Sequence, residues 1–377
     1  MKRSELAIVG GGVVGAFAAF LAAERGLKVT VVEAGHLGNG ASGKCAGIHT
    51  TQLVIPIDIE LSKRSQEIYR KLAGESVVES GFLSIEPSWI SRYSTELLSN
   101  AGVRYKVLSC GELKDWIDWI RIRDYEVGVL TPEDIVLDVA ALFKSLRERL
   151  EELNVSIYEW SEVTGIDVKN KKLFVDGGRE RISYDYALFA TGAWNKDLLD
   201  KSGVWRVPVL IYACQVLSLN TVQDLPSVPL FLEESHVYMR RFGRNSVIVG
   251  NGYALKLHSP SECPLHPSKE FADEISQKLF DRLKQPERYF LAGGWAGVCS
   301  SSPDGRPIVG RIPGYEDLFI VDALDGYGLM RGPALSQDVV GYIASGNAPP
   351  YLEDFSPSRF NNYSGEPETV IELHSRA

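Results

Sequence analysis

The chain has 377 residues, of which 45% are hydrophobic and 24% charged, and a formal net charge of −9 at pH 7. This length is enough for two substantial domains, and the acidic balance argues against general binding to nucleic acid or to anionic membranes. Five cysteines without a CxxC pair and six scattered histidines argue against a disulfide framework and against a metal site, and they fit a protein of the reducing cytoplasm.

The first predicted element is part of an eighteen-residue stretch without charge, Leu6–Ala23, which follows a basic start. Such a stretch lies at the lower limit for a transmembrane helix and also has features of a secretion signal. Gly10, Gly12 and Gly15 interrupt it at the spacing G-x-G-x-x-G. Both a transmembrane segment and a secretion signal need a helix here, and glycine is unfavourable in a helix. The spacing therefore favours a globular fold without a transmembrane segment.

A strand, a helix and a second strand surround these glycines. The pattern predicts a buried strand over Leu6–Val9, a helix over Val13–Arg25 and a β-rich run over Lys28–Val32, followed by Glu33. Together they make the βαβ unit that binds dinucleotides. A lone G-x-G-x-x-G is a weak signal, whereas the complete unit is a strong one.

Each glycine has a physical role in such a unit. Gly10 permits the tight turn, Gly12 lets the backbone approach a pyrophosphate, and Gly15 lets the helix pack closely on the strand. The helix N-terminus offers unpaired amides and a positive dipole end to the phosphates. Glu33, 23 residues after Gly10, would accept hydrogen bonds from the ribose hydroxyls.

Further helices and strands are predicted along the chain before residue 290. A strand over Tyr186–Ala190 runs into Thr191 and Gly192, small residues that would let the backbone pass close to a cofactor, although an ordinary strand-to-loop turn has the same pattern. The other predicted elements before residue 290 are the helices Ile59–Leu72 and Val136–Leu150 and the strands Asn154–Glu159, Cys214–Leu219, Val237–Arg240 and Ser246–Val249.

The C-terminal part repeats the order of strand, glycine turn and helix. We expect a strand over Leu318–Val321, a turn over Asp325–Gly332 and a helix over Pro333–Ala344, with a proline near its start. A second helix N-terminus directed at a cofactor would suit the electron-rich edge of a reduced flavin, where negative charge develops.

Three further motifs carry a resemblance to a known family: ASGKCAG at residues 41–47, ATGAW at 190–194 and WAGVCSSSPDGRPIVG at 295–310. With them, the chain resembles the FAD-dependent amino-acid and amine oxidoreductases, which include glycine oxidase, D-amino-acid oxidase and dehydrogenase, sarcosine oxidase and the β subunit of archaeal proline dehydrogenase. The resemblance extends from about Leu6 to Phe360. It implies an α/β fold: a Rossmann-like, glutathione-reductase-type FAD-binding domain plus an α+β substrate domain with a large mixed sheet.

The resemblance also implies how the chain divides and which residues bind FAD. Residues 1–80, 131–212 and 290–360 would form a discontinuous FAD-binding domain, residues 81–130 and 213–289 the substrate domain, and residues 361–377 a tail. The implied FAD-binding residues are Gly10, Gly12, Val13, Val14, Gly15, Glu33, Ala34, Ser42, Lys44, Cys45, Ala46, Gly47, Val163, Ala190, Thr191, Gly192, Trp194, Asp325, Gly326, Gly328, Leu329 and Met330.

The reaction implied by the resemblance is removal of hydride from a carbon that bears an amine, with delivery to flavin N5. The substrate would be a small amino acid, an imino acid or an N-methyl amine. The protein has to orient the reacting C–H and fix the substrate carboxylate. No acid–base residue is obligatory if the amine binds in its neutral form.

The sequence departs from the family where relatives bind the substrate carboxylate. Cys299 stands where glycine oxidase and several D-amino-acid enzymes have an arginine, and Met330 stands where sarcosine oxidases have a lysine. A thiol cannot replace a bidentate guanidinium. Either another cation takes this role, or the substrate is not a simple α-amino acid. The cations considered are Arg240, Arg241, Lys44 and Arg331.

Three more side chains are candidates at the substrate. Tyr238 matches a substrate-facing tyrosine of glycine oxidase, with a buried strand tyrosine as the alternative. Tyr253 and His49 have weaker support, since a lone histidine is more often structural. The complete set of candidate substrate-site residues is His49, Tyr238, Arg240, Tyr253, Cys299 and Arg331.

The attachment of FAD and the electron acceptor follow from single positions. Some relatives tether FAD through a histidine where this chain has Lys44, and monomeric sarcosine oxidase uses a cysteine at a position offset by two residues from Cys299. We therefore expect non-covalent FAD. Ile248 stands where sarcosine oxidase places a lysine that assists oxygen reduction, which favours a dehydrogenase that passes electrons to a dye, a quinone or a partner subunit.

Two alternatives keep the cofactor and change the function. An FAD-dependent 2-hydroxy-acid or glycerol-phosphate dehydrogenase would need a base for the hydroxyl proton, and His49 would be that base. A non-catalytic flavoprotein subunit would bind FAD for assembly or for electron relay.

Overall fold

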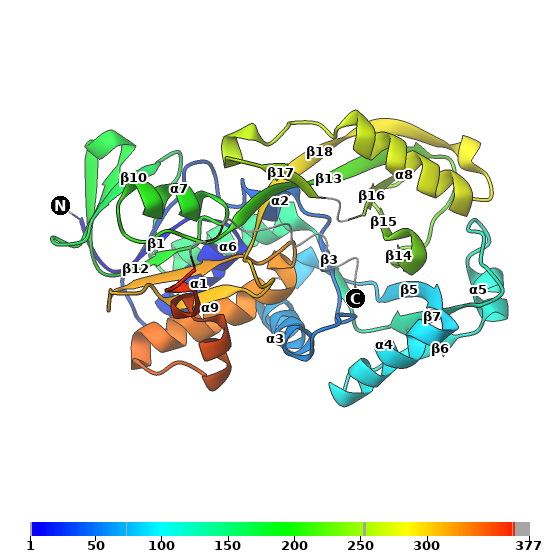
Figure 1. The fold of residues 1–377 in the computed structure, drawn as a ribbon, viewed down its shortest axis with the longest axis horizontal. Coiled ribbons are helices and arrows are strands. Elements are labelled where there is room, and N and C mark those ends of the chain that lie inside the picture. Colours follow the sequence, from blue (N-terminus) through cyan, green and yellow to red (C-terminus); the bar gives the residue numbers. More distant parts are fainter. Residues whose placement is uncertain (1, 73, 252–253, 364, 366–377) are drawn as a thin grey trace.

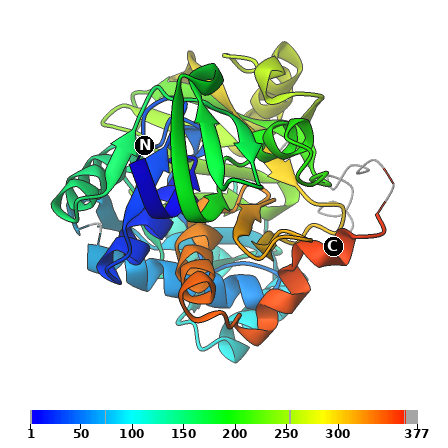
Figure 2. The ribbon, with the colours of Figure 1, turned by 90° about the vertical axis from the view of Figure 1, so that its left-hand side faces the viewer.

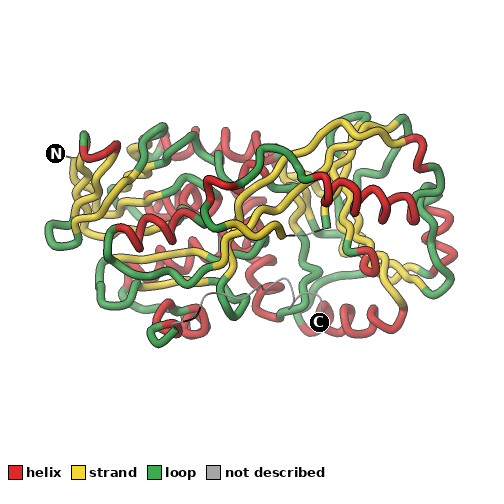
Figure 3. The backbone as a smooth tube through the Cα atoms, turned by 45° about the horizontal axis from the view of Figure 1, so that its top comes forward, coloured by secondary structure: helices red, strands yellow, loops and turns green. Residues whose placement is uncertain are grey.

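Two large β-sheets and a smaller one of three strands organise the molecule (Figure 1). The computed structural model describes residues 2–72, 74–251, 254–363 and 365. The molecule is extended in one direction, and its strands gather toward both ends of the long axis (Figure 3). Among the described residues, no helix has the length and apolar character needed to cross a membrane.

The first sheet has the strand order of a dinucleotide-binding domain. Its eight strands run β10-β11-β12-β1-β2-β9, with β20 beside β12 and β19 beside β20. The strands β20, β12, β1, β2 and β9 are mutually parallel, and such strands are buried on both faces. Their bounds are β1 Lys2–Val9, β2 Val29–Val32, β9 Ser156–Tyr158, β10 Val163–Asp167, β11 Lys172–Val175, β12 Glu180–Phe189, β19 Ile308–Arg311 and β20 Leu318–Asp322.

Helix α1 (Val13–Glu24) connects β1 to β2 and is buried over most of its length. It packs against helix α9 (Gly328–Ser345), which lies beside the strands of the first sheet (Figure 2). Apolar residues from both helices and from β1 share one hydrophobic core. This burial explains why the opening stretch carries no charge: it is the centre of a globular core, as the glycine spacing predicts.

Helix α9 begins earlier than the sequence predicts. It starts at Gly328, five residues before Pro333, so the proline lies inside the helix. Proline has no N–H to donate to the carbonyl oxygen of Leu329. The Tyr69 hydroxyl donates to that oxygen instead, at 3.0 Å. A side chain from helix α3 (Pro56–Leu72) thus replaces the missing backbone hydrogen bond.

Helix α6 begins later than the sequence predicts. It covers Val139–Glu152, because Val136 belongs to β8 (Ile135–Leu137). The Asp138 side chain caps the helix by accepting a hydrogen bond from the Ala141 amide at 3.0 Å. In the smaller sheet β8 pairs with two short strands, β3 Ile48–His49 and β4 Val77–Glu79.

The second sheet is large and mixed, which confirms the predicted fold class. Its nine strands run β17-β13-β16-β15-β14-β5-β7-β6, with β18 paired to β13. Among the described strands of this sheet, β14 and β5 are the only pair that runs parallel. The strands are β5 Phe82–Pro87, β6 Lys106–Leu108, β7 Glu126–Thr131, β13 Leu210–Thr221, β14 Leu230–Leu232, β15 Val237–Arg241, β16 Ser246–Gly250, β17 Ala254–Leu257 and β18 Tyr289–Ser301.

The pairing of β18 bears on the predicted domain division. β18 pairs with β13 from Leu210↔Ser301 to Thr221↔Tyr289. Residues 290–301 therefore belong to the second sheet, although the prediction assigned them to the FAD-binding domain. The other strands of this sheet come from residues 82–131 and 210–257.

Five more α-helices of the described residues surround the two sheets. α4 and α5 pack on the β5–β7 part of the second sheet, and α8 shares a core with its strands. The helices are α2 Ala41–Lys44, α4 Ser88–Asn100, α5 Cys110–Trp116, α7 Trp194–Lys201 and α8 Lys269–Arg282. Short 3₁₀ helices cover Gly74–Ser76, Asp176–Gly178, Glu233–Ser235, Pro260–Glu262, Pro286–Arg288, Pro350–Phe355 and Pro357–Phe360.

Candidate active site

One continuous cavity of about 1900 Å³ connects the glycine turn after β1 to a face of the second sheet. It exceeds the volume of ordinary small-molecule pockets, roughly 300–1,000 Å³. The size is sufficient for a dinucleotide together with a substrate. Of the predicted FAD-binding residues, all except Gly15 line this cavity.

The turn after β1 can be built only with glycine. Gly10 has a φ of +101°, and a Cβ atom on it would lie 2.6 Å from the carbonyl oxygen of Ala190. A Cβ atom on Gly15 would lie 1.9 Å from the carbonyl oxygen of Gly10. Gly15 therefore supports the turn from behind, by allowing helix and strand to touch, and does not face the cavity.

The N-terminus of α1 opens into the cavity. The N-cap residue is Gly12, which has no side chain that could accept a hydrogen bond from the helix amides. The Val13 amide donates to the Ser42 hydroxyl at 3.0 Å. The other amides of the first turn have no acceptor within the helix. Together with the helix dipole they form a site for a pyrophosphate, so the turn fits the predicted cofactor.

Glu33 directly follows β2 and lies beside the glycine turn at the cavity wall. Its carboxylate accepts hydrogen bonds from the Gly11 amide at 2.7 Å and from the Gly35 amide at 2.8 Å. A carboxylate has about four lone-pair positions, so two remain for ribose hydroxyls. The carboxylate is thus already oriented by the backbone.

Next to the predicted adenine contact Val163, the cavity is lined by residues that the sequence analysis did not select. Trp160 has 72% of its surface exposed, and its ring lies 6.1 Å from that of His36. Ser161 and Glu162 complete this wall. The sequence could have identified Trp160. A tryptophan directly after a strand of the dinucleotide-binding unit can present its flat ring to the cofactor.

The segment 41–47, which contains α2, is held by the second sheet. The Trp295 indole donates to the Lys44 carbonyl at 2.7 Å, and an Arg240 Nη donates to the Ala46 carbonyl. Gly47 has a φ of +68°, and a Cβ atom there would lie 2.4 Å from the Leu137 carbonyl oxygen. This loop can therefore adopt its course only with glycine at its end.

A polar network joins the ends of β12 and β20 at the cavity wall. The Thr191 hydroxyl donates to Asn195 at 2.6 Å, and Asn195 donates to Asp322 at 3.2 Å. Asp322 also accepts from the Ser300 hydroxyl at 2.5 Å, and burial raises the pKa of Asp322 to about 6. The sequence analysis identified Thr191 but missed the other three residues.

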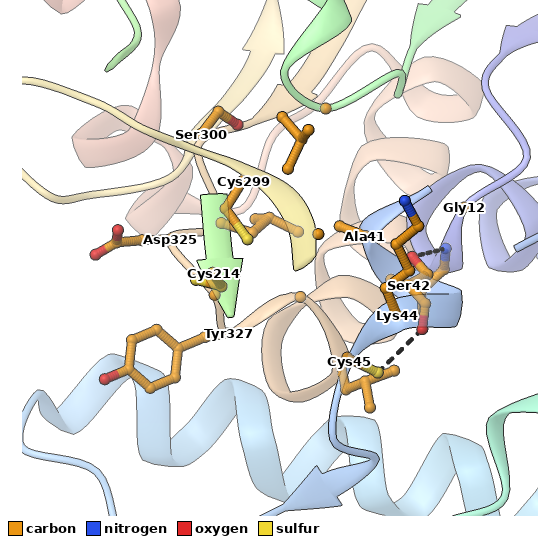
Figure 4. A pocket seen from close by; sticks show the side chains of 18 of the residues that line it. Gly12, Ala41, Ser42, Lys44, Cys45, Cys214, Cys299, Ser300, Asp325 and Tyr327 are labelled. Carbon is orange, nitrogen blue, oxygen red and sulfur yellow. Dashed lines mark hydrogen bonds between the residues drawn. The ribbon is translucent and has the colours of Figure 1, made fainter. Parts of the chain in front are cut away.

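Cys299 lies beside Cys214 on adjacent strands, near Asp325 (Figure 4). Contact with Cys214 and burial raise the pKa of Cys299 well above its usual value, so the thiol is neutral. Asp325 accepts a hydrogen bond from the Tyr212 hydroxyl at 2.8 Å. Where the relatives have an arginine, this chain has a neutral thiol beside a carboxylate.

Arg331, a candidate substrate anchor in the sequence analysis, is paired with a carboxylate of the protein itself. It is 3% exposed, does not line the cavity and forms a buried ion pair with Asp58, with Nε 2.8 Å from a carboxylate oxygen. Asp58 lies in the first turn of α3. The positive charge at the start of α9, which the sequence analysis attributed to a ligand anion, is balanced by this carboxylate.

His49 is likewise outside the cavity lining. Its ring is fully buried and packs edge-on against Tyr69, with ring centres 5.5 Å apart. Burial lowers the pKa of His49 to about 3, and neither ring nitrogen has a hydrogen-bond partner among the described residues. Strand β3 thus places this candidate substrate-site residue in the core, away from the cavity lining.

Of the remaining candidate residues that the structure describes, one lines the cavity and two form hydrogen bonds to backbone carbonyl oxygens. Tyr238 lines the cavity, and burial raises the pKa of its hydroxyl. Arg240 supports the loop at Ala46 rather than lining the cavity, and Arg241 donates to the carbonyl oxygens of Gly243 and Leu225. Tyr253 lies outside the described residues.

Comparisons with known proteins identify the family of the chain. A family model described as FAD dependent oxidoreductase matches residues 5–341. Glycine oxidase of Pseudomonas putida is 26% identical over 352 residues, which cover 88% of this chain and 92% of the relative. Glycine oxidase of Bacillus licheniformis is 24% identical over 361 residues, with coverages of 91% and 93%. The crystal structure of L-proline dehydrogenase from P. horikoshii matches with a TM-score of 0.86 at 24% identity, over 96% of this chain and 98% of that chain. The chain is therefore a member of the FAD-dependent oxidoreductase family, and FAD is its cofactor.

Proposed function

We propose that this protein oxidises the C–N bond of an amine, an imino acid or an amino acid. Bound FAD supplies the chemistry, by accepting a hydride at N5 from the carbon that bears the nitrogen. The observation that carries the proposal is the single cavity that joins the dinucleotide cradle to the Tyr238 face of the second sheet. The matches to the glycine oxidases and to L-proline dehydrogenase favour the same chemistry.

In this proposal the chain binds and orients and does little proton transfer. The turn at Gly10 and Gly12 would hold the pyrophosphate and Glu33 the ribose, and the N-terminus of α9 would stabilise negative charge on the reduced flavin. Tyr238 and the backbone of β13 and β18 form the wall that orients the substrate. Closing this wall around the reacting C–H excludes water, which strengthens each polar contact inside.

We propose that FAD is bound without a covalent link. Burial raises the pKa of Cys45 to about 11, and its thiol donates to the Ser42 carbonyl at 3.0 Å. Cys299 is neutral as well, and a thiol must be ionised to act as a nucleophile. Cys45 and Cys299 therefore lack the ionised thiol that forming a thioether bond to the flavin would need.

We also propose a dehydrogenase rather than an oxidase, with a dye, a quinone or a partner subunit as acceptor. Ile248 is fully buried in β16 and brings no charge to the position where the resemblance predicts an oxygen-activating lysine. The five free cysteines favour a reducing compartment such as the cytoplasm.

Oxidation of a hydroxy acid is the weaker reading. Removal of hydride from an alcohol carbon usually needs a base for the hydroxyl proton. His49, the base considered for that role, is buried outside the cavity lining with a lowered pKa.

The test is the visible spectrum followed by anaerobic reduction. The purified protein should be yellow, and acid precipitation should release the colour into the supernatant. Amines or amino acids should bleach the flavin under argon, whereas 2-hydroxy acids and glycerol phosphate should not. A protein that carries FAD and is bleached by no amine or amino acid would instead be a non-catalytic flavoprotein subunit.

A further inference from the structure

The charges that line the cavity are mainly negative. Eight carboxylates and three lysines line it, and no arginine does so among the described residues. Lys278 pairs with Glu274 at 2.7 Å and Lys201 with Asp197 at 3.4 Å, so two of the lysines are balanced by acids. Lys44, the third, belongs to the loop that holds the cofactor. The cavity therefore offers little to bind a substrate carboxylate.

Two of the carboxylates lie far from the FAD-binding residues, at the other end of the cavity. This acidic end consists of Glu86 on β5 and Glu233 in the short helix that follows β14, with Trp89, Tyr93 and Phe231. Burial raises the pKa of both glutamates. The charge of Glu233 raises the pKa of Glu86 further, whereas the Ser84 and Ser94 hydroxyls lower it in part. The nearby His236 partly lowers the pKa of Glu233. A cation placed between them would relieve this cost.

Glu86 has an unsatisfied oxygen at this end. The residue is 3% exposed and lines the cavity. One carboxylate oxygen accepts from the Ser84 hydroxyl at 2.9 Å, and the other has no hydrogen-bond partner among the described residues. An orphaned buried carboxylate oxygen is costly, and a ligand that donates to it removes the cost.

The strand register fixes how this end relates to Tyr238. Tyr238 pairs with Phe231, and Phe231 pairs with Ser84, so the three side chains lie on one face of the sheet. Glu86 lies two residues beyond Ser84 and shares that face. Two strand spacings and two residues along β5 separate the backbones of Tyr238 and Glu86 by roughly 12 Å. A ligand that touches both must be elongated.

Aromatic rings cover the path between the two ends. Phe231 and Tyr238 lie on the sheet, and Trp89 and Tyr93 belong to α4 and remain partly exposed. Aromatic faces attract ammonium groups, and a cavity wall lined by acidic residues concentrates cations. Both features select the same kind of ligand.

We propose that the substrate is an elongated amine with a second cationic group, such as a diamine or a polyamine. Its distal ammonium would bind Glu86 and Glu233, while its reacting amine lies beside Tyr238. The inference rests on the proposed function and narrows its substrate class. The neutral reacting amine loses a hydride to FAD and becomes an iminium ion, which water converts to an aldehyde and ammonium.

The experiment compares ligands that differ by one charge. Flavin bleaching under argon is followed by stopped flow with cadaverine and spermidine, with pentylamine as the matched monoamine, and with glycine and L-proline. The apparent Kd of cadaverine should be lower than that of pentylamine by about 10- to 100-fold, the size of one charge-assisted contact. Glu86→Gln should remove most of this preference and change pentylamine by less than twofold.

Two control variants separate binding of the distal ammonium from a loss of folding and from the long-range electrostatic effect of removing a negative charge. Glu96→Gln removes the same charge from the exposed side of α4 and should leave the preference intact. Glu233→Gln, at a less buried position, should reduce the preference even if Glu86→Gln folds poorly.

The outcomes distinguish this inference from the proposed function. Bleaching by glycine or L-proline with no preference for cadaverine over pentylamine would overturn the inference and leave the proposed function standing. Equal loss of cadaverine and pentylamine binding in Glu86→Gln would assign Glu86 a structural role and also overturn it. An FAD-loaded protein that no amine or amino acid bleaches would end both.

Discussion

Replacing Asp58 with asparagine should destabilise the protein through Arg331. The two side chains are 6% and 3% exposed and form a buried ion pair. Removing one partner of such a pair costs about 3–5 kcal/mol, because the other charge stays buried. Here the orphaned charge would also lie in the first turns of α9, at the positive end of the helix dipole.

The expected shift in melting temperature follows from the length of the chain. With 377 residues, the entropy of unfolding is about 0.8 kcal/mol per kelvin if the chain unfolds as one unit. A loss of 3–5 kcal/mol then lowers Tm by about 4–6 °C. Differential scanning calorimetry of the FAD-loaded protein measures this shift, and the double variant Asp58→Asn/Arg331→Met, which removes both charges, should recover most of it.

One pattern of results would refute this reasoning. If Asp58→Asn melts within about 1 °C of the parent protein while Arg331→Met abolishes flavin reduction by every amine, then Arg331 acts on the substrate and the ion pair is incidental. That result would restore the role that the sequence analysis gave to Arg331.

Three more predictions follow from the site. Gly15→Ala should abolish FAD binding, measured as loss of yellow colour in the folded protein, because the new methyl group would displace the carbonyl of Gly10. His49→Ala should keep the rate of flavin reduction by amines within about threefold, since a core substitution acts mainly on stability; a loss of turnover at unchanged Tm would contradict the placement of His49. Asp322, with a pKa raised to about 6 by burial, holds its proton more tightly when folded. Stability from this group is present below pH 4 and lost as pH rises through 6, by about 3 kcal/mol. Unfolding in urea at pH 4.5 and pH 7 should show this loss relative to Asp322→Asn, and an equal pH dependence in the two proteins would refute it.

The sequence was sufficient for the cofactor half of the site, because that half depends on local backbone geometry. A G-x-G-x-x-G turn needs glycine at Gly10 and Gly15 in any such fold, and Glu33 follows at a fixed distance along the chain. The predicted cavity-lining residues are concentrated in such short motifs. Local sequence and three-dimensional site coincide there.

The substrate half could not be predicted in the same way. Whether Arg331 faces a ligand or Asp58 depends on how α3 packs against α9, which are far apart in the sequence. Glu86 gives no local signal at all, and it reaches the cavity only because β5 pairs with β14. Cys299 shows in the sequence that the carboxylate-binding arginine of the relatives is missing. The carboxylates that line the cavity can be identified only from the pairing of distant strands.

The segment at residues 41–47 is bonded to the second sheet. Its carbonyl oxygens at Lys44 and Ala46 accept hydrogen bonds from Trp295 on β18 and from Arg240 on β15. If this segment contacts the flavin, as the resemblance implies, a compound that displaces β15 or β18 on binding also changes the affinity for FAD. By thermodynamic reciprocity, FAD then changes the affinity for that compound by the same factor. The binding of the prosthetic group and the binding of its reductant would be coupled in this way.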